Sequence, residues 1–558
     1  MASFDQDKNQ FKVLIAGGSL VGLGLALAFE RAGIEYELFE KGDFATQLGA
    51  SIGIHPHTIR ILEQLGVWED IEKQVIPLQV RKHYDGNGHC FEDSLVLVDI
   101  NEILQRPIVF MERCKALEVL YNHVQDKSKL HARTAVVGYE ETPQTVIVTT
   151  EDGTQHHGHI LIGADGIHSK VRKLMADKIS VTDQALANEI NEAFTSEYDC
   201  IFAVSRNDAG KQFLPDAMVH NVYYDNYSAI AAAGVPGLVF WFLFVKDSKC
   251  TRTPNCPRFT DEDAEATILK YGSSIVGPEY TVKDLWDARV KGTMVPLEEG
   301  VIKQWSHNRV VLMGDSVHKA TINPGLGGNL AYEGIARLTN GLVPLLKDNP
   351  MPSLQQLTEV FNQYIAGQKP RAKTVVDLSG QITRYEAQDT WVLKFAARHI
   401  VPWVSDRIKA KLYASFSRGG PYLEYLPLPA MDAEPTKSAK KHSRGIFPKQ
   451  ITIVMLIGGT AAIFWDLFRS KVSTNKEHVS GVDVSVLNAY GYLVSKASSK
   501  CFGPPRLDEA TIRSIDFNRT SSRMLQDMRE ETWGWVVYRT TYCSEPLPQS
   551  NRNPHFVD

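Results

Sequence analysis

The chain has 558 residues, of which 43% are hydrophobic and 22% are charged. This balance is typical of a globular protein and excludes a wholly disordered or collagen-like chain. With 60 Lys and Arg against 65 Asp and Glu, the formal net charge is −5, which gives no electrostatic basis for nucleic-acid binding. The seven cysteines show no CxxC or Cys/His ligand spacing, so we expect neither a disulfide framework nor a cysteine zinc site.

The N-terminal part of the chain has the pattern of a β-α-β unit. An apolar strand at 12–16 leads into a glycine-rich turn, and an apolar helix pattern follows over 20–31. A second short strand at 36–39 ends at Glu40. We therefore expect a parallel sheet that begins with these two strands.

The turn of this unit is close to the dinucleotide fingerprint G-x-G-x-x-G. Gly17 and Gly22 fit its first and last glycines, whereas Ser19 stands at the middle position. A helix that starts here offers free N–H groups to a pyrophosphate, and Glu40 is placed to accept hydrogen bonds from ribose hydroxyls. An acidic residue disfavours a 2′-phosphate, so the pattern favours FAD or NAD over NADP.

Further along the chain, apolar periodicity predicts the elements that follow. Residues 180–300 are rich in strand-like runs, which indicates a second, β-rich domain. The remaining expectations are helices over 51–75 and near 117–124, strands at 146–150, 160–162 and 309–313, and a mostly helical region over 352–425.

Two more glycine-rich turns follow predicted strands. The first is the run GADGIHSKVR, which contains Asp165 and begins directly after the strand at 160–162. The second is Gly314-Asp315, which is followed by PGLGGN at 324–329. Either turn alone is an ordinary strand end, but their joint order with the first turn argues against coincidence.

The sequence resembles the single-component FAD-dependent monooxygenases with the para-hydroxybenzoate hydroxylase fold. The three turns are similar to that group's glycine fingerprint, D-G motif and G-D motif, over about residues 11–430. Within the group, four stretches resemble the paxilline-type epoxidases of fungal secondary metabolism. These stretches are GASIGIHPHTIRILEQLG, PIVFMERCKALEVLY, VFWFLF and LMGDSVHKATINPGLGGN.

The resemblance implies cofactor-binding roles for individual residues. Glu40 would hold the adenosine ribose, Gly53 would contact the cofactor, and Arg113 would lie near the pyrophosphate or ribityl chain. Asp315 would bind the ribityl hydroxyls, and Gly328, with Gly327 and Asn329, would lie by the isoalloxazine ring. The implied set is Gly17, Gly22, Glu40, Gly53, Arg113, Asp165, Asp315 and Gly328 for FAD, with NADPH or NADH as co-substrate and no metal.

Two positions depart from the pattern of the group. Ile322 stands where the group often has Pro, and Leu326 stands where it often has Gln. We expect cofactor binding to survive these changes, because backbone groups do most of that work. On the substrate side, a loose alignment selects Tyr224 as a candidate catalytic residue for positioning or proton donation, although aromatic packing is the ordinary role of such a tyrosine.

The predicted fold class is α/β: a Rossmann-like FAD-binding domain with an inserted β-rich substrate domain, a C-terminal helical region and a single membrane segment. The segment is predicted at 450–468, where an uncharged apolar run has basic residues on both sides. A buried core helix is the alternative. The predicted parts are 1–180 and 285–345 (FAD-binding domain), 181–284 (substrate domain), 346–430 (helical region), 431–449 (basic linker), 450–468 (membrane segment) and 472–558 (a tail of unknown role).

These expectations combine into one function. The chain would be a membrane protein, in the endoplasmic reticulum with its catalytic part facing the cytosol. It would use NAD(P)H and O₂ to epoxidise an alkene of a hydrophobic, prenylated substrate. The alternatives are a phenol hydroxylase of the same fold, a dehydrogenase or reductase, and a non-catalytic flavin-binding membrane scaffold. The sequence leaves the oligomeric state open.

Overall fold

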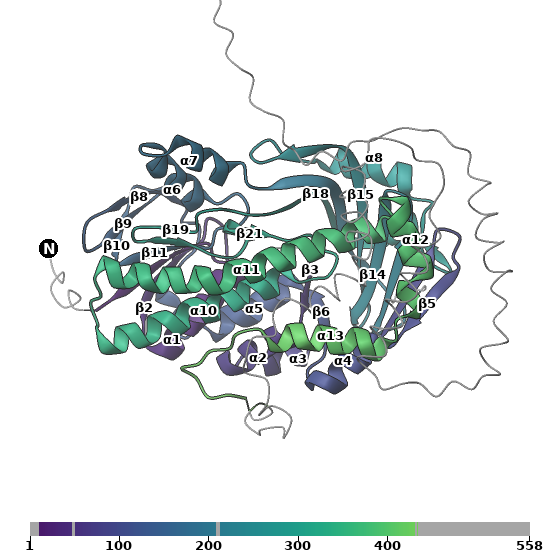
Figure 1. Cartoon of the computed structure of the whole chain (residues 1–558), viewed down its shortest axis with the longest axis horizontal. Helices are drawn as coiled ribbons and strands as arrows, with labels where there is room; N and C mark the ends of the chain where they lie inside the picture. Colours follow the sequence, from purple (N-terminus) through teal and green to yellow (C-terminus); the bar gives the residue numbers. More distant parts are fainter. Residues whose placement is uncertain (1–9, 47–50, 208–211, 430–431, 433–558) are drawn as a thin grey trace, which may run out of the picture. The chain divides into compact units, whose positions relative to one another are not determined.

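The computed structural model describes residues 10–46, 51–207, 212–429 and 432, and Figure 1 shows the arrangement of their helices and strands. All of them belong to the first of two units, Met1–Trp465. The description that follows concerns this unit alone.

A six-stranded sheet forms the centre of the N-terminal half. Its strand order is β19-β20-β11-β1-β2-β7, and all neighbours are parallel except β19 and β20. The central strands are almost wholly apolar and buried, as expected of a parallel sheet covered on both faces. Their bounds are β1 Lys12–Ala16, β2 Glu35–Phe39, β7 Leu130–His131, β11 Ile160–Gly163, β19 Ser306–His307 and β20 Val310–Leu312.

Helices and a small antiparallel sheet cover this sheet. Helix α1 packs against α10 and α5, and α10 packs against the 33-residue helix α11. The small sheet lies against β1, where a Cβ on Gly158 would come within 2.6 Å of Leu14. The bounds are α1 Leu20–Ala32, α5 Arg113–His123, α6 Lys170–Ser180, α10 Gly327–Asp348, α11 Leu354–Glu386, β8 Val136–Glu141, β9 Val146–Thr150 and β10 Gln155–Gly158.

An eight-stranded sheet forms the second half, in the order β21-β18-β12-β15-β14-β13-β4-β5. Strands β4, β5, β18 and β21 come from outside 181–284, so residues distant in sequence complete this sheet. Helix α11 reaches from α10 to β18 and β13, and Figure 1 shows it running across both halves. The bounds are β4 Val80–Asp85, β5 Cys90–Ser94, β12 Thr195–Arg206, β13 Met218–Tyr223, β14 Tyr227–Val235, β15 Leu238–Arg252, β18 Arg289–Val301 and β21 His318–Lys319.

The two faces of the eight-stranded sheet bury different clusters, because side chains alternate along each strand. Trp241 and Leu243 on β15 pack on one face with residues of α8 and α9. Phe242 and Phe244 lie on the other face with residues of α4 and α13. The bounds are α4 Val96–Leu104, α8 Asp261–Tyr271, α9 Val282–Asp287 and α13 Asp406–Arg418.

The predicted helix over 51–75 is partly wrong. Its first residues form strand β3, which pairs antiparallel with β6, and only the remainder is helical. Pairing with a strand more than fifty residues away overrides the local pattern. The elements not yet given are β3 Ser51–Ile54, α2 Pro56–Leu65, α3 Trp68–Glu72, β6 Val109–Glu112, η1 Lys127–Lys129, α7 Gln184–Asn191, β16 Ile275–Gly277, β17 Tyr280–Thr281, η2 Gly314–Ser316, α12 Trp391–His399 and η3 Val401–Trp403.

The membrane part of the predicted fold class is corrected. Among the helices of the described residues, none is both long enough and apolar enough to span a bilayer. Residues 450–468, on which that prediction rested, lie outside the described part of the chain, as do the linker at 431–449 (apart from Asp432) and the tail at 472–558. The single membrane segment and the location in the endoplasmic reticulum are therefore withdrawn.

Candidate active site

The three glycine-rich turns meet at one edge of the six-stranded sheet. They follow β1, β11 and β20, which are adjacent and parallel, so their carboxyl ends lie together. A Cβ on Gly17 would come within 2.4 Å of the carbonyl oxygen of Ala164, and one on Gly314 within 2.8 Å of Val21. The Gly166 N–H also donates to the Ser316 hydroxyl at 3.2 Å. Residues about 150 positions apart therefore form one site.

The first turn requires its glycines. Gly17 has φ +105°, a conformation that L residues rarely adopt, and its N–H donates to the Phe39 carbonyl at 2.8 Å. A Cβ on Gly22 would approach the Gly17 carbonyl oxygen to 1.9 Å. Helix α1 therefore packs directly on the turn, and its N-terminal N–H groups face the site.

Ser19 has a role that a glycine at the middle position would not supply. It is the N-cap residue of α1, but its side chain makes no capping bond there. Instead, its hydroxyl accepts a hydrogen bond from the Arg113 guanidinium at 2.9 Å. This contact brings the first residue of α5 to the start of α1. The sequence placed Arg113 near the pyrophosphate only through the family resemblance.

Arg113 carries a positive charge that the surrounding described residues neutralise only in part. Its Nε is buried and has no hydrogen-bond partner, and no carboxylate of the described residues lies within ion-pair distance of it. Burial lowers the pKa of Arg113, while the charges of Asp315 and Tyr332 oppose that shift. A guanidinium beside a helix N-terminus and short of partners is suited to an anionic group such as a phosphate.

Asp315 lies in η2, in the last of the three turns. Its carboxylate forms an ion pair with Lys319 at 2.5 Å. Burial alone would raise the pKa of Asp315, but Lys319 and Arg113 outweigh burial, and the pKa falls below its ordinary value. The carboxylate therefore stays ionised and can accept hydrogen bonds from ligand hydroxyls.

Glu40 lies at the end of β2, beside the first turn. One carboxylate oxygen accepts a hydrogen bond from the Gly18 N–H at 2.6 Å, and the other accepts one from the Gly42 N–H at 3.0 Å. The side chain thus reaches the glycine turn as the sequence predicts. Its contact with a ribose stays a prediction.

Asp165 holds the second turn together. Its carboxylate accepts hydrogen bonds from the Ser169 hydroxyl at 2.5 Å and from the N–H groups of Lys170 and Val171 at 2.6 and 3.0 Å. It therefore stabilises the N-terminus of α6. Arg172 donates to the carbonyl of Ser316 at 3.0 Å and so ties the second turn to the third. A direct contact of Asp165 with the cofactor stays a prediction.

Gly53 and Gly328 are joined by a residue whose role the sequence did not reveal. The Asn329 amide donates to the carbonyls of Gly53 and Gly325 at 2.8 and 2.7 Å, and its oxygen accepts from the His55 N–H at 2.9 Å. The side chain is 1% exposed. Asn329 therefore fixes the start of α10 against β3. Its partners are up to 276 residues away, so only its place beside Gly328 was visible in the sequence.

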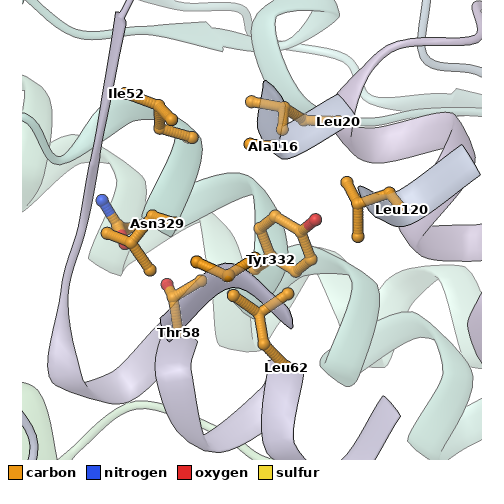
Figure 2. Close-up of a pocket in the computed structure, with 11 residues that line it drawn as sticks. Leu20, Ile52, Thr58, Leu62, Ala116, Leu120, Asn329 and Tyr332 are labelled. Atoms are coloured by element: carbon orange, nitrogen blue, oxygen red, sulfur yellow. The ribbon is translucent and has the colours of Figure 1, made fainter. Parts of the chain in front are cut away.

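A small cavity lies beneath the start of α10 (Figure 2). It has a volume of about 10 Å³, room for one water at most, and mainly apolar side chains surround it. Figure 2 shows Tyr332 of α10 at the centre, with Leu20 above it, Leu120 to its right and Thr58 below it on the left. The Thr58 hydroxyl is buried and has no hydrogen-bond partner. This cavity is too small for a cofactor or a substrate.

A buried carboxylate connects α11 to the loop that precedes α10. Glu386 is 1% exposed and accepts hydrogen bonds from the side-chain amides of Asn221 at 2.9 Å and Asn323 at 2.6 Å. Arg81 approaches the same carboxylate at 3.3 Å. Burial raises the pKa of Glu386, and these three donors oppose that shift. This cluster was not predicted, because Glu386 is one of many polar residues on a long helix.

Tyr224 directly follows β13. Its hydroxyl donates to the Ile275 carbonyl at 3.0 Å, and its ring stacks on Tyr227 with centroids 4.3 Å apart. Burial raises the pKa of Tyr224 well above its ordinary value. The structure thus places it against β16, with its only hydroxyl proton in a backbone hydrogen bond. Its catalytic role stays a prediction.

The residues of this site fit FAD. Within the described part of the chain, no side chain caps the start of α1, the Arg113 Nε has no hydrogen-bond partner, and Asp315 is ionised. These groups match a pyrophosphate and polyhydroxyl chain. Helix α10 directs the N–H groups of Gly327 and Gly328 toward the same region, where a helix N-terminus favours negative charge.

Comparison with known proteins agrees with the assignment of this site to FAD. The model of the family described as FAD binding domain matches residues 10–379. The FAD-dependent monooxygenase penM of Penicillium crustosum is 36% identical over 426 residues, which cover 76% of this chain and 89% of the relative. The FAD-dependent monooxygenase ptmM of Penicillium ochrochloron is 36% identical over 75% of this chain and 99% of its own length.

A solved structure supports the fold. HpxO of Klebsiella pneumoniae, crystallised with FAD and uric acid, superposes with a TM-score of 0.60 at 17% identity, covering 74% of this chain and 97% of HpxO. The site and fold define an FAD-dependent oxidoreductase. The chain belongs to the FAD-binding-domain family, and within it to the FAD-dependent monooxygenases of the paxilline type. This assignment sets aside the non-catalytic scaffold.

Proposed function

We propose that this monooxygenase epoxidises an alkene of a hydrophobic, prenylated substrate. The balanced reaction is alkene + O₂ + NAD(P)H + H⁺ → epoxide + NAD(P)⁺ + H₂O. One oxygen atom enters the substrate, the other leaves as water, and NAD(P)H supplies the two electrons. Bound FAD would accept the hydride and activate O₂.

The observation that carries the proposal is the apolar face of the eight-stranded sheet. Phe242 and Phe244 stack there with centroids 5.9 Å apart, and Phe110 of β6 meets Phe242 edge-on at 6.1 Å. Ile322, in the loop before α10, packs against the same cluster. Phe242 and Phe244 are themselves buried, whereas Phe110 and Ile322 at the edge of the cluster are partly exposed. A partly exposed apolar edge of this kind favours a hydrocarbon chain over a charged or strongly polar substrate.

The protein's own contribution is to bind, orient and exclude water. Arg113 and the N-terminus of α1 would hold the phosphates of FAD, and Asp315 would hold its ribityl hydroxyl groups. The start of α10 would favour negative charge on the reduced ring. The aromatic cluster would exclude water from the substrate side.

The test is product analysis with the purified full chain, FAD, NADPH or NADH, and ¹⁸O₂. Two substrate sets are offered: aromatic compounds with a long prenyl chain, and phenols without one. We expect the prenylated set to give an epoxide that carries one ¹⁸O atom. Ring hydroxylation of the plain phenols would favour the hydroxylase instead. Oxidised product without ¹⁸O would refute oxygen transfer.

A further inference from the structure

Three metal-binding side chains meet on the far side of β2 from helix α1. Glu37 lies on β2, His131 on β7 and His156 on β10. One ligand atom from each lies within 4.8 Å of the other two. The Glu37 carboxylate oxygen Oε2 is 2.6 Å from Nδ1 of His156 and 3.5 Å from Nε2 of His131. The proposed function uses none of these residues.

The spacing agrees with a tetrahedral metal. With metal–nitrogen bonds of about 2.05 Å, two ligand atoms lie about 3.4 Å apart and two bound imidazole rings have centroids about 5.2 Å apart. The rings of His131 and His156 have centroids 5.2 Å apart. The distance from Glu37 Oε2 to His131 Nε2 is already close to 3.4 Å. The distance from Glu37 Oε2 to His156 Nδ1 must increase by about 0.8 Å.

Apart from the 2.6 Å hydrogen bond between His156 Nδ1 and Glu37 Oε2, which metal binding would replace, the surroundings leave the ligand atoms available. Nε2 of His131 is buried and makes no hydrogen bond. Lys12 binds Oε1 of Glu37 at 2.9 Å, so Oε2 remains directed at the two imidazoles. The buried ring of Phe39 stacks on His131 at 5.1 Å and meets His156 edge-on at 4.6 Å. A hydrogen-bonded carboxylate and packed rings are typical supports of a metal's first ligands.

The types of ligand atom indicate which metal ion would bind. Two imidazoles and one carboxylate suit Zn²⁺ and its neighbours Co²⁺ and Ni²⁺, whereas Mg²⁺ and Ca²⁺ prefer oxygen ligands alone. Three protein ligands leave a fourth position for water. The geometry points to a Zn²⁺ site formed by Glu37, His131 and His156, which joins the six-stranded sheet to the small β8–β10 sheet.

This site is next to the adenosine end of the FAD site. The carbonyl of His131 accepts a hydrogen bond from the Glu40 N–H at 2.9 Å. A metal bound at His131 would therefore fix β7 against β2 beside the residue predicted to hold the ribose. The role we assign to the metal is structural, because its three ligands come from three different strands, β2, β7 and β10, which it would tie together.

The test is Zn²⁺ titration by calorimetry of the chelator-treated full chain, followed by Co²⁺ absorption spectroscopy. His156→Ala and His131→Ala each remove one ligand, whereas His157→Ala removes the exposed next residue on β10 and is the control. Changes outside the first ligands often cost about 10–100-fold in affinity. We therefore expect at least a 100-fold loss for both ligand variants, and none for the control.

The Co²⁺ complex should show the intense visible bands of a four-coordinate site in the parent and the control, and lose them in His156→Ala. Where an alanine variant fails to fold, by circular dichroism, Glu37→Gln replaces it, since it preserves side-chain size and removes the charge. Equal Zn²⁺ affinity and equal Co²⁺ spectra in the parent, His156→Ala and Glu37→Gln would overturn the site. FAD binding and turnover do not enter this test, so it is independent of the proposed reaction.

Discussion

Replacing Asn329 by alanine tests how α10 is held at the active site. The change removes three hydrogen bonds in a side chain that is 1% exposed, and it leaves the His55 N–H without its acceptor. Each lost bond is worth about 1 kcal/mol, and a stranded buried N–H costs about 1–3 kcal/mol. We expect the free energy of unfolding to fall by about 3–5 kcal/mol.

Asn340 is a matched control on the same helix. Its side chain also donates to one backbone carbonyl, that of Tyr422 at 2.8 Å, and accepts from one N–H, that of Glu424 at 2.9 Å. Asn340 is only partly buried, so water can form much of the hydrogen bonding that Asn340→Ala removes. We expect Asn340→Ala to cost about 1 kcal/mol.

Urea unfolding followed by circular dichroism measures both variants, and quenching of flavin fluorescence measures FAD affinity. Because Asn329 fixes Gly53 and the start of α10, we expect Asn329→Ala to weaken FAD binding by about tenfold or more, equivalent to about 1.4 kcal/mol. Asn340→Ala should bind FAD as the parent does. Equal losses of stability in the two variants, with unchanged FAD affinity in both, would refute the role of Asn329.

Three further predictions concern charge, turn geometry and pH. Arg113→Met should weaken FAD binding by about 100-fold but leave the FAD-free protein at least as stable, because it removes a desolvated charge whose Nε has no partner and which, among the described residues, only the Ser19 hydroxyl binds. FAD titration measures the first effect and urea unfolding without FAD measures the second. A less stable FAD-free variant would contradict the prediction. Gly17→Ala should abolish FAD retention during purification, because φ at this residue is +105° and the new methyl group would clash with Ala164. The yellow colour of the purified variant measures the retained FAD. Full retention would show that the turn adapts. Burial lowers the pKa of three histidines from 6.5: to about 3 for His55 and to about 4 for His220 and His318. These residues are neutral when folded and protonate first in the unfolded chain, so stability is fully present above pH 6.5 and is lost as the pH falls toward 4. The urea midpoint should therefore decline steadily from pH 6.5 to 4, and a flat profile would show that their protonation is not linked to unfolding.

The parts of the fold that the sequence predicted are those written in contiguous residues. The strand at 12–16, the glycine turn and the helix that follows occur as β1 and α1. Strong local signals produce them: an apolar run, glycines where φ is positive or backbones touch, and Gly33 in the left-handed conformation at the end of α1. The order of the three turns then supported the family resemblance from which the FAD-binding fold was predicted.

The other parts of the fold and of the site depend on contacts between residues that are far apart in the chain. Residues 51–54 carry a helical pattern but form β3, because β6 offers hydrogen bonds that a helix there would leave unused. The polar contacts of Asn329 and Glu386 join residues that are up to 276 positions apart. No local pattern distinguishes such a buried asparagine or glutamate from an exposed one on a helix. Glu386 was therefore not predicted as part of the site, and Asn329 was placed by the flavin only through the family resemblance.

The loop before α10 shows how long-range contacts accommodate a local departure from the family pattern. Ile322 replaces the common Pro, and buried Leu326 replaces the common Gln. The turn persists because the Gly325 N–H donates to the Ile322 carbonyl at 2.7 Å, with Gly325 at φ +68°. Glu386 then holds one side of this turn through Asn323, and Asn329 holds the other through the Gly325 carbonyl. Two buried polar side chains thus fix the loop from opposite ends, and Ile322 packs against the aromatic cluster of the eight-stranded sheet.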